Sequence, residues 1–130
     1  MPLDKIAEKL DLKKVRAEYD SGRIWIDFHA NSTVLRDYFL DTGANITSLL
    51  ADDIARLDLR YRSMNSHLTI NGKELSLTFG PLVISWPGIS HELDYIYQAD
   101  DPAYRKIGTD VLGSLIIGID ASSHWVYLSD

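Results

Sequence analysis

Asp41 stands at the end of an apolar run and is followed at once by a turn, in the stretch FLDTGANIT, residues 39–47. A carboxylate beside apolar residues is costly unless hydrogen bonds or a neighbouring charge stabilise it. Thr42 offers a hydroxyl, and Gly43, which has no Cβ, allows backbone amides to approach the acid. Because a single acid in such a turn most often caps the turn, these residues alone leave a structural and a chemical role open.

Other catalytic chemistries lack the residue patterns that they need. The chain has no cysteine, which excludes a cysteine nucleophile and thiolate metal sites. Its four histidines have no paired spacing, and in HELDY, residues 91–95, Tyr95 stands where a zinc-protease helix needs its second histidine. No Gly-x-Ser-x-Gly elbow and no glycine-rich phosphate loop occurs. We therefore expect neither a metal nor a cofactor.

Composition is typical of one soluble globular domain. The chain has 130 residues, of which 45% are hydrophobic and 25% charged, and no apolar run approaches the roughly 20 residues of a membrane helix. The formal net charge of −6 disfavours nucleic acid as a partner, because that backbone needs a basic surface. Charged residues also interrupt the first ten positions, so no signal peptide is indicated. We expect a cytoplasmic protein, or a domain excised from a larger one, that binds neither nucleic acid nor membrane.

The elements before Asp41 are predicted from the apolar spacing. Helical spacing after Pro2 predicts a short helix over residues 3 to about 12. Alternation of apolar and polar residues then predicts two strands joined by the turn at residues 20–22. A third strand, residues 34–40, follows a reversal at residues 31–32 and delivers Asp41.

Beyond Asp41 the strongest local signal is the Asn71-Gly72 turn, which predicts a hairpin with strands on both sides within residues 67–86. The other expected elements are a helix of about two turns within residues 48–59, one strand over residues 91–98, a short helix capped by Thr109 or Asp110, and a final strand over residues 124–128. The chain is therefore predicted to be mainly β with two or three short helices.

Two motifs together resemble the retroviral-type aspartic proteases, the single-domain retropepsins and their cellular and bacterial relatives. FLDTGANIT resembles the family's apolar-apolar-Asp-Thr-Gly-Ala stretch, and IGTDVLGSL, residues 107–115, resembles its later apolar-Gly-x-Asp/Asn-x-Leu stretch. The family has a helix, a flap hairpin and further strands between them, which is the order predicted here. The resemblance implies a closed β-barrel-like retropepsin fold with a flap hairpin. Residues 23–130 would form the protease domain, and residues 1–22 a helix-and-strand extension.

The resemblance also assigns roles to single residues. Asp41 would be the catalytic acid. The residues that would support the active-site loop are Thr42, Gly43, Ile107 and Gly108. The residues that would contact substrate are Ala44, Asn45, Ile70, Asn71 and Gly72.

Three features depart from the family pattern. Asn45 stands where viral members commonly have an aspartate, and Lys106 occupies a position that is usually apolar. The hairpin tip at Asn71-Gly72 also lacks a glycine-rich run. The first two features bear on specificity, and the third on the identity of the flap.

The length of the chain predicts how the chemistry would be assembled. Peptide hydrolysis by this route needs two carboxylates that share one proton, one acting as base toward water and the other polarising the scissile carbonyl. The only other candidate, YDSG at residues 19–22, lies too close to Asp41, and Glu18 interrupts the apolar strand required behind it. We therefore expect the second Asp41 to come from another copy across a two-fold axis.

The sequence thus predicts a homodimeric aspartic endopeptidase that acts on peptide or protein substrates. A second interpretation is a non-catalytic retropepsin-like module that binds extended peptides or assembly partners by strand addition. A third is an unrelated small β-barrel in which Asp41 only caps a turn.

Overall fold

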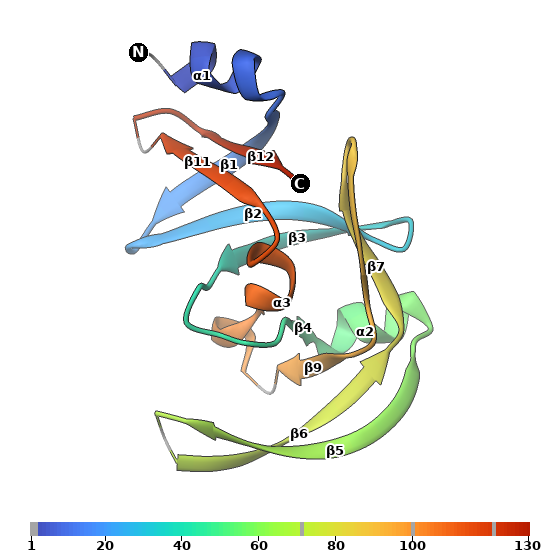
Figure 1. Cartoon of the computed structure of the whole chain (residues 1–130). Helices are drawn as coiled ribbons and strands as arrows, with labels where there is room; N and C mark the ends of the chain where they lie inside the picture. Colours follow the sequence, from blue (N-terminus) through green and yellow to red (C-terminus); the bar gives the residue numbers. More distant parts are fainter. Residues whose placement is uncertain (1–2, 71, 100, 121) are drawn as a thin grey trace.

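The computed structural model describes residues 3–70, 72–99, 101–120 and 122–130. These residues form a mainly β structure with three short α-helices, as the sequence predicted, and one 3-10 turn (Figure 1). The helices are α1 (Leu3–Leu10), α2 (Ala51–Leu57) and α3 (Thr109–Leu112), and the 3-10 turn is Pro102–Tyr104. The strands are β1 (Lys13–Asp20), β2 (Arg23–Ala30), β3 (Thr33–Leu40), β4 (Ser48–Leu50), β5 (Arg60–Thr69), β6 (Gly72–Gly80), β7 (Leu82–Trp86), β8 (Ile89–Leu93), β9 (Ile96–Ala99), β10 (Lys106–Ile107), β11 (Ile116–Asp120) and β12 (Trp125–Ser129). None of the described helices is long and apolar enough to pass through a lipid bilayer.

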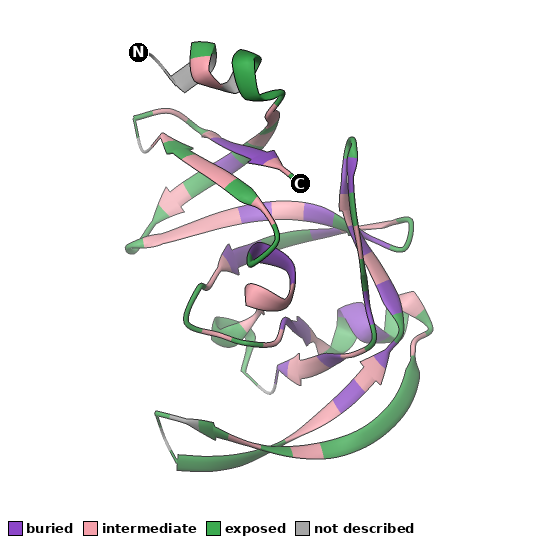
Figure 2. Cartoon of the chain, in the orientation of Figure 1, coloured by how far each residue is buried: buried purple, intermediate pink, exposed green. Residues whose placement is uncertain are grey.

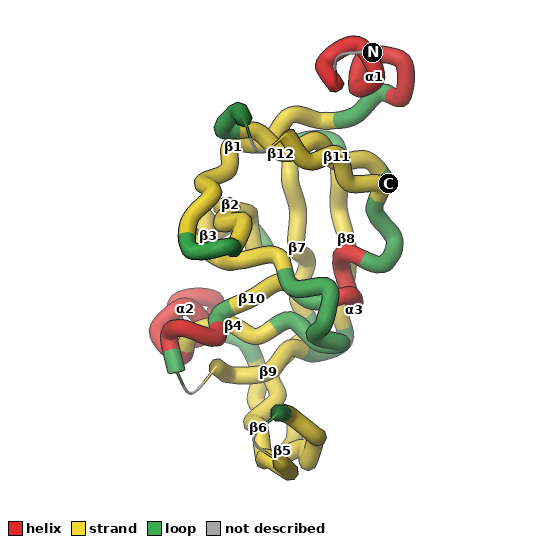
Figure 3. The backbone as a smooth tube through the Cα atoms, turned by 90° about the vertical axis from the view of Figure 1, so that its left-hand side faces the viewer, coloured by secondary structure: helices red, strands yellow, loops and turns green. Residues whose placement is uncertain are grey.

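The strands form one open sheet in the order β11-β12-β1-β2-β3-β10-β4-β9-β6-β5, and β7 and β8 branch from it at β2. Its two ends lie at opposite ends of the molecule, with β11 beside α1 and with the β5–β6 hairpin far below (Figures 1 and 3). The prediction of a closed barrel was therefore wrong. The reason is that β6 meets β9 through Thr78 and Phe79, near its own end, and the rest of the hairpin extends away from the sheet.

Several boundaries also differ from those predicted. The apolar run at residues 91–98 is two strands, β8 and β9, because the chain turns between the buried Leu93 and Ile96 and each strand pairs with a different neighbour. Strand β5 begins at Arg60, earlier than expected, because its first residues are exposed and show no apolar alternation. Strands β4, β10 and β11 were not predicted, whereas the turn at residues 20–22 is the predicted hairpin between β1 and β2.

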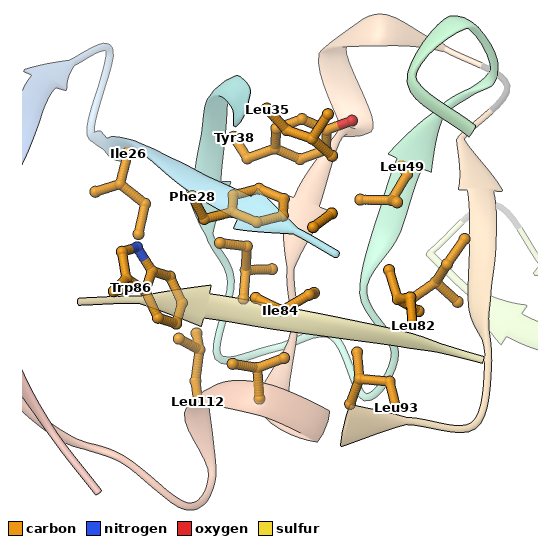
Figure 4. Packing of buried hydrophobic residues seen from close by; sticks show 14 of the residues in the cluster. Ile26, Phe28, Leu35, Tyr38, Leu49, Leu82, Ile84, Trp86, Leu93 and Leu112 are labelled. Carbon is orange, nitrogen blue, oxygen red and sulfur yellow. The ribbon is translucent and has the colours of Figure 1, made fainter. Parts of the chain in front are cut away.

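The core lies between β2, β3, β4, β7 and α3, whose buried side chains meet in Figure 4. The Phe28 and Tyr38 rings pack edge to face with centroids 5.0 Å apart, and Phe28 also contacts Trp86. Burial of one such large apolar side chain contributes about 1.5 to 3 kcal/mol. Purple segments of Figure 2 mark this core, whereas the β5–β6 hairpin is mostly green and exposed. The core therefore supports the end of β3, where Asp41 follows.

A buried polar contact fixes α2 to β3. The hydroxyl of Tyr38 donates to Oδ2 of Asp53 at 2.6 Å and accepts from the Leu50 N–H at 2.9 Å. Burial and the Asp53 acceptor raise the pKa of Tyr38 well above its ordinary value. Asp53 in turn lies 3.1 Å from the Arg56 guanidinium. Because Leu50 ends the strand that follows the Asp41 loop, this network also anchors the far end of that loop.

Tyr38→Phe should lower the free energy of unfolding by about 1 to 3 kcal/mol, because it removes the donor to Asp53 and the acceptor for the Leu50 N–H. Urea unfolding followed by circular dichroism measures the change. The matched control is Tyr61→Phe, whose side chain is exposed, and it should stay within about 0.5 kcal/mol of wild type. Equal losses in the two variants would contradict the structural role of Tyr38.

Candidate active site

Asp41 is fixed at the end of β3 by its backbone and by its carboxylate. Its N–H donates to the Ile107 carbonyl at 2.9 Å, which continues the parallel pairing of β3 with β10. Its Oδ1 accepts from the Gly43 N–H at 2.9 Å. The side chain remains 28% exposed. The carboxylate is therefore oriented by the chain and still open to solvent on one side.

Glycines allow the close contacts around this carboxylate. A Cβ on Gly43 would lie 3.2 Å from Asp41 Oδ1, which is tighter than ordinary contact. A Cβ on Gly108 would lie 2.8 Å from the Ala44 carbonyl oxygen and 3.0 Å from the Ile46 carbonyl carbon. Because both of the latter are backbone atoms, a side chain at position 108 would push the loop away.

The start of α3 forms hydrogen bonds to the loop that follows Asp41, residues 42–47. The Thr109 N–H donates to the Ala44 carbonyl at 2.8 Å, and the Asp110 N–H donates to the Asn45 carbonyl at 3.2 Å. The Thr109 hydroxyl adds a bond to the Ala44 carbonyl at 3.2 Å. The carbonyls of Ala44 and Asn45, two of the predicted substrate-binding residues, are thus used to hold the loop, while the Asn45 side chain is exposed.

The strongest link between the two motifs joins Thr47 to Asp110. The Asp110 carboxylate accepts from the Thr47 N–H at 2.9 Å and from its hydroxyl at 2.7 Å. The same hydroxyl accepts from the Gly108 N–H at 3.1 Å, and Thr47 is fully buried. The prediction that Thr109 or Asp110 caps α3 was wrong, because Gly108 holds the cap position and no side chain caps the helix. The Gly-x-Asp spacing of the second motif had singled out Asp110. Its carboxylate bonds Thr47 in the Asp41 loop and not the start of α3.

Lys106 is a member of the site that sequence reasoning noted only as a departure. Its Nζ lies 3.9 Å from Asp41 Oδ2, and its side chain is 24% exposed. In β10 it pairs in parallel with Phe39 and antiparallel with Ser48, so the strands on both sides hold it. The Asp41 carboxylate therefore has a backbone N–H on one oxygen and an ammonium near the other.

The hairpin residues lie apart from this cluster. Ile70 is almost fully exposed at the tip of the β5–β6 hairpin, and Gly72 begins β6 with a φ of 100°. Asn71 lies outside the described residues. The tip and the loop between β3 and β4 point to the same side of the molecule (Figures 1 and 3). The flap role stays a prediction.

Thr42 lies at the most open point of the loop. Both Thr42 and Gly43 are exposed, whereas Ile107 is buried under them. Within the described part of the chain, the Thr42 hydroxyl has no side-chain or backbone partner. The structure thus brings together Asp41, Gly43, Ala44, Ile107 and Gly108, and leaves Thr42 facing outward.

A serine, a histidine and an aspartate also meet, but without the geometry of a nucleophile. Ser114 Oγ lies 3.4 Å from His91 Nδ1, and His91 Nε2 lies 3.2 Å from Asp130 Oδ1. The Ser114 hydroxyl also lies 3.2 Å from the Val111 carbonyl and donates to it, and His91 Nε2 makes no hydrogen bond within the described residues. No group of three or more metal-binding side chains gathers in the part of the chain that the structure describes.

Comparison with solved structures shows that the fold of the chain is shared with known proteins. No family model and no curated protein matches the sequence. Among solved structures, the crystal structure of a retropepsin-like aspartic protease from Rickettsia conorii is similar, with a TM-score of 0.66 and 19% sequence identity, and the match covers 90% of each chain. At this identity the similarity shows a shared fold.

Thr47→Val should lower the free energy of unfolding by about 1 to 3 kcal/mol, because it leaves the Gly108 N–H and one Asp110 oxygen without their buried partner. The change in volume is small, so packing is a minor term. Thr47→Ser retains the hydroxyl and should recover most of the loss. Chemical denaturation gives the free energies, and amide hydrogen exchange at Gly108 reports the lost bond. Equal stability of the valine and serine variants would contradict the bridging role.

Proposed function

We propose that this protein is a homodimeric aspartic endopeptidase in which each of two copies supplies one Asp41. The observation that carries the proposal is the Asp41 carboxylate, which the Gly43 N–H orients at the end of β3 while one side stays open. This carboxylate occurs in a chain with the fold of a retropepsin-like aspartic protease. Neither feature alone specifies the chemistry, but together they support an acid–base role for Asp41.

The proposed mechanism requires two carboxylates that share one proton. The ionised Asp41 takes a proton from a bound water, the water oxygen adds to the scissile carbonyl, and the protonated Asp41 of the second copy gives its proton to the carbonyl oxygen. The tetrahedral intermediate then collapses, the C–N bond breaks, and a proton passes to the leaving nitrogen. No metal or cofactor takes part in these steps.

The exposed part of the loop supports a second copy as the source of the other carboxylate. Thr42 and Gly43 are open to an approaching loop, and the contacts of Asp41 within one chain are with a backbone N–H and an ammonium rather than a carboxylate. Strand β11, at one end of the sheet, also exposes about half of Ile116 and of Ile119. Exposed apolar side chains on an edge strand favour pairing with another chain. In the dimer, the Thr42 hydroxyl would lock the two loops together.

The β5–β6 hairpin is proposed as the flap, with Ile70, Asn71 and Gly72 touching the substrate and Ala44 and Asn45 lining the subsites. The hairpin pairs mostly with itself, and its tip lies on the side of the Asp41 loop. Segments with few buried contacts open at low free-energy cost, which suits a lid. We also propose residues 23–130 as the protease domain. Strand β1 of the extension pairs with both β2 and β12, so the extension belongs to the same sheet.

A second candidate function is a non-catalytic module that binds extended peptides. The observation that favours it is the Lys106 ammonium near Asp41, which already balances the carboxylate within one chain. Such a module would bind unfolded segments at a sheet edge without cleaving them. The two candidates differ in one measurable outcome, which is the appearance of cleaved peptide.

Asp41→Asn should reduce cleavage of an unfolded protein substrate by roughly 10²- to 10⁴-fold, because an amide keeps the shape of the side chain but cannot act as a base. The assay uses mass spectrometry of products at mildly acidic pH and high enzyme concentration. Asp58→Asn is the control, since Asp58 is exposed at the C-cap of α2 and an asparagine suits its positive φ. A folded Asp41→Asn protein with wild-type activity would remove Asp41 from the mechanism, and binding without any cleavage by wild type would favour the second candidate.

Specific activity should fall on dilution, because each chain holds half of the site and a dissociated monomer has none. Thr42→Ala should move this fall to higher protein concentration by weakening association by about 1 to 3 kcal/mol. Thr33→Ala, at the opposite end of β3, should leave it unchanged. Sedimentation equilibrium and activity are measured over the same concentration series. A monomer with undiminished specific activity would contradict the shared site.

A further inference from the structure

Lys106 places a cation beside the carboxylate that the proposed mechanism uses. The Lys106 Nζ and Asp41 Oδ2 are 3.9 Å apart, and both side chains are about three-quarters covered. Charges covered to this degree are screened less by water and salt than charges on an open surface. Any peptide bond that reaches the open side of Asp41 must therefore bring its neighbouring side chains close to a poorly screened ammonium.

The position of Lys106 in β10 sets the direction of its side chain. Ile107, the other residue of β10, is fully buried in the core, and successive side chains of a strand point to opposite faces. Lys106 therefore points away from the core, on the face where Asp41 is open. The Tyr104 ring centroid lies 5.9 Å from its Nζ. The ammonium is thus part of the built site rather than a mobile surface group.

Two arginine side chains pack on aromatic residues of the strands near Lys106, which pairs with Phe39. The Arg105 guanidinium lies over the Trp25 ring at 4.9 Å, and the Arg23 guanidinium lies over the Phe39 ring at 4.3 Å. Both guanidinium groups bond backbone carbonyls. Within the described residues, neither makes an ion pair with a carboxylate. Of these three cations, Lys106 is the one that lies near the Asp41 carboxylate.

The proposed use of Asp41 as a base changes its interaction with Lys106. Without substrate, the positive charge of Lys106 offsets the negative charge of Asp41. Once Asp41 acts as a base on water, an ammonium 3.9 Å from Oδ2 competes with the water for that oxygen. A carboxylate from the substrate would pair with Lys106 instead, and would leave Asp41 Oδ2 to the water.

We propose that Lys106 makes the site selective for peptides that carry aspartate or glutamate at a residue flanking the cleaved bond. This inference rests on the proposed protease function. Lys106 acts here as a specificity-determining residue, which pairs with the acidic side chain of the substrate and exchanges no proton. In the substrate, glutamine has the size of glutamate but no charge, so it cannot form this ion pair with Lys106.

The test compares paired peptides in the full-length protein. Cleavage of unfolded proteins first locates favoured bonds by mass spectrometry. Peptides are then made around one such bond with glutamate or glutamine at each flanking position. For wild type at low salt, kcat/KM should be about five- to tenfold higher for one glutamate peptide, and this ratio should shrink as salt is raised. Lys106→Met should bring the ratio to about one, and Lys106→Glu should favour the matching lysine peptide.

The control is Lys13→Met, which breaks another lysine–aspartate pair, with Asp11 at 3.4 Å. Strand β1, which carries Lys13, is separated from β10 in the sheet by β2 and β3, so the glutamate preference should persist. Should Lys106→Met fail to fold, the salt dependence of the glutamate preference of wild type still tests the inference.

The outcomes separate this inference from the proposed function. Cleavage of glutamate and glutamine peptides at equal kcat/KM by wild type, or a salt-independent preference, overturns the role of Lys106 and leaves the protease assignment standing. The same holds if folded Lys106→Met retains the preference. Absence of any cleavage by a protein that sedimentation shows to be dimeric overturns the protease assignment, and the inference with it.

Discussion

The position of Asp41 depends on the buried hydrogen bonds between Thr47 and the Asp110 carboxylate, which join residues 63 positions apart. They tie the loop after β3 to the first turn of α3. Without them the loop would still be tied to α3 through the Ala44 and Asn45 carbonyls, but the Asp110 carboxylate would lose both of these partners. Burial makes the loss of this contact costly, because an unmade bond there costs more than a made bond gains. The absence of a Cβ at Gly108 then lets the two segments touch.

The electrostatics of the site follow from where this contact places the chain. Pairing of β10 with both β3 and β4 brings Lys106 beside Asp41, and the same pairing buries Ile107. One strand of two residues thus supplies a core side chain and a cation at the site. The carboxylate gains one hydrogen bond from Gly43 and one nearby charge, and it keeps an open side. A site arranged in this way is stable in one chain but has room for a second group to approach.

Local patterns predicted what depends on neighbours in sequence, and missed what depends on distant pairing. The strand that delivers Asp41, the hairpin around residues 71–72 and the helix after the loop were all found, because alternation, turn residues and helical spacing are local signals. The open sheet was not, since closure depends on which edge strands meet. The cap role expected for Asp110 was wrong for the same reason, because its partner lies in another motif. The contact of Lys106 with Asp41 follows from a parallel pairing that leaves no local trace.

The failure of the sheet to close has a physical cause in the residues of the β5–β6 hairpin. The β5–β6 hairpin exposes the apolar side chains of Met64, Leu68 and Leu75, whereas His67 points the other way and stacks on Tyr97 with ring centroids 4.7 Å apart. A hairpin with a polar inner face has little reason to collapse onto the core, because its polar groups would lose water without gaining apolar burial. It remains extended and pairs mostly with itself. The polar face of the hairpin therefore keeps the sheet open at this end.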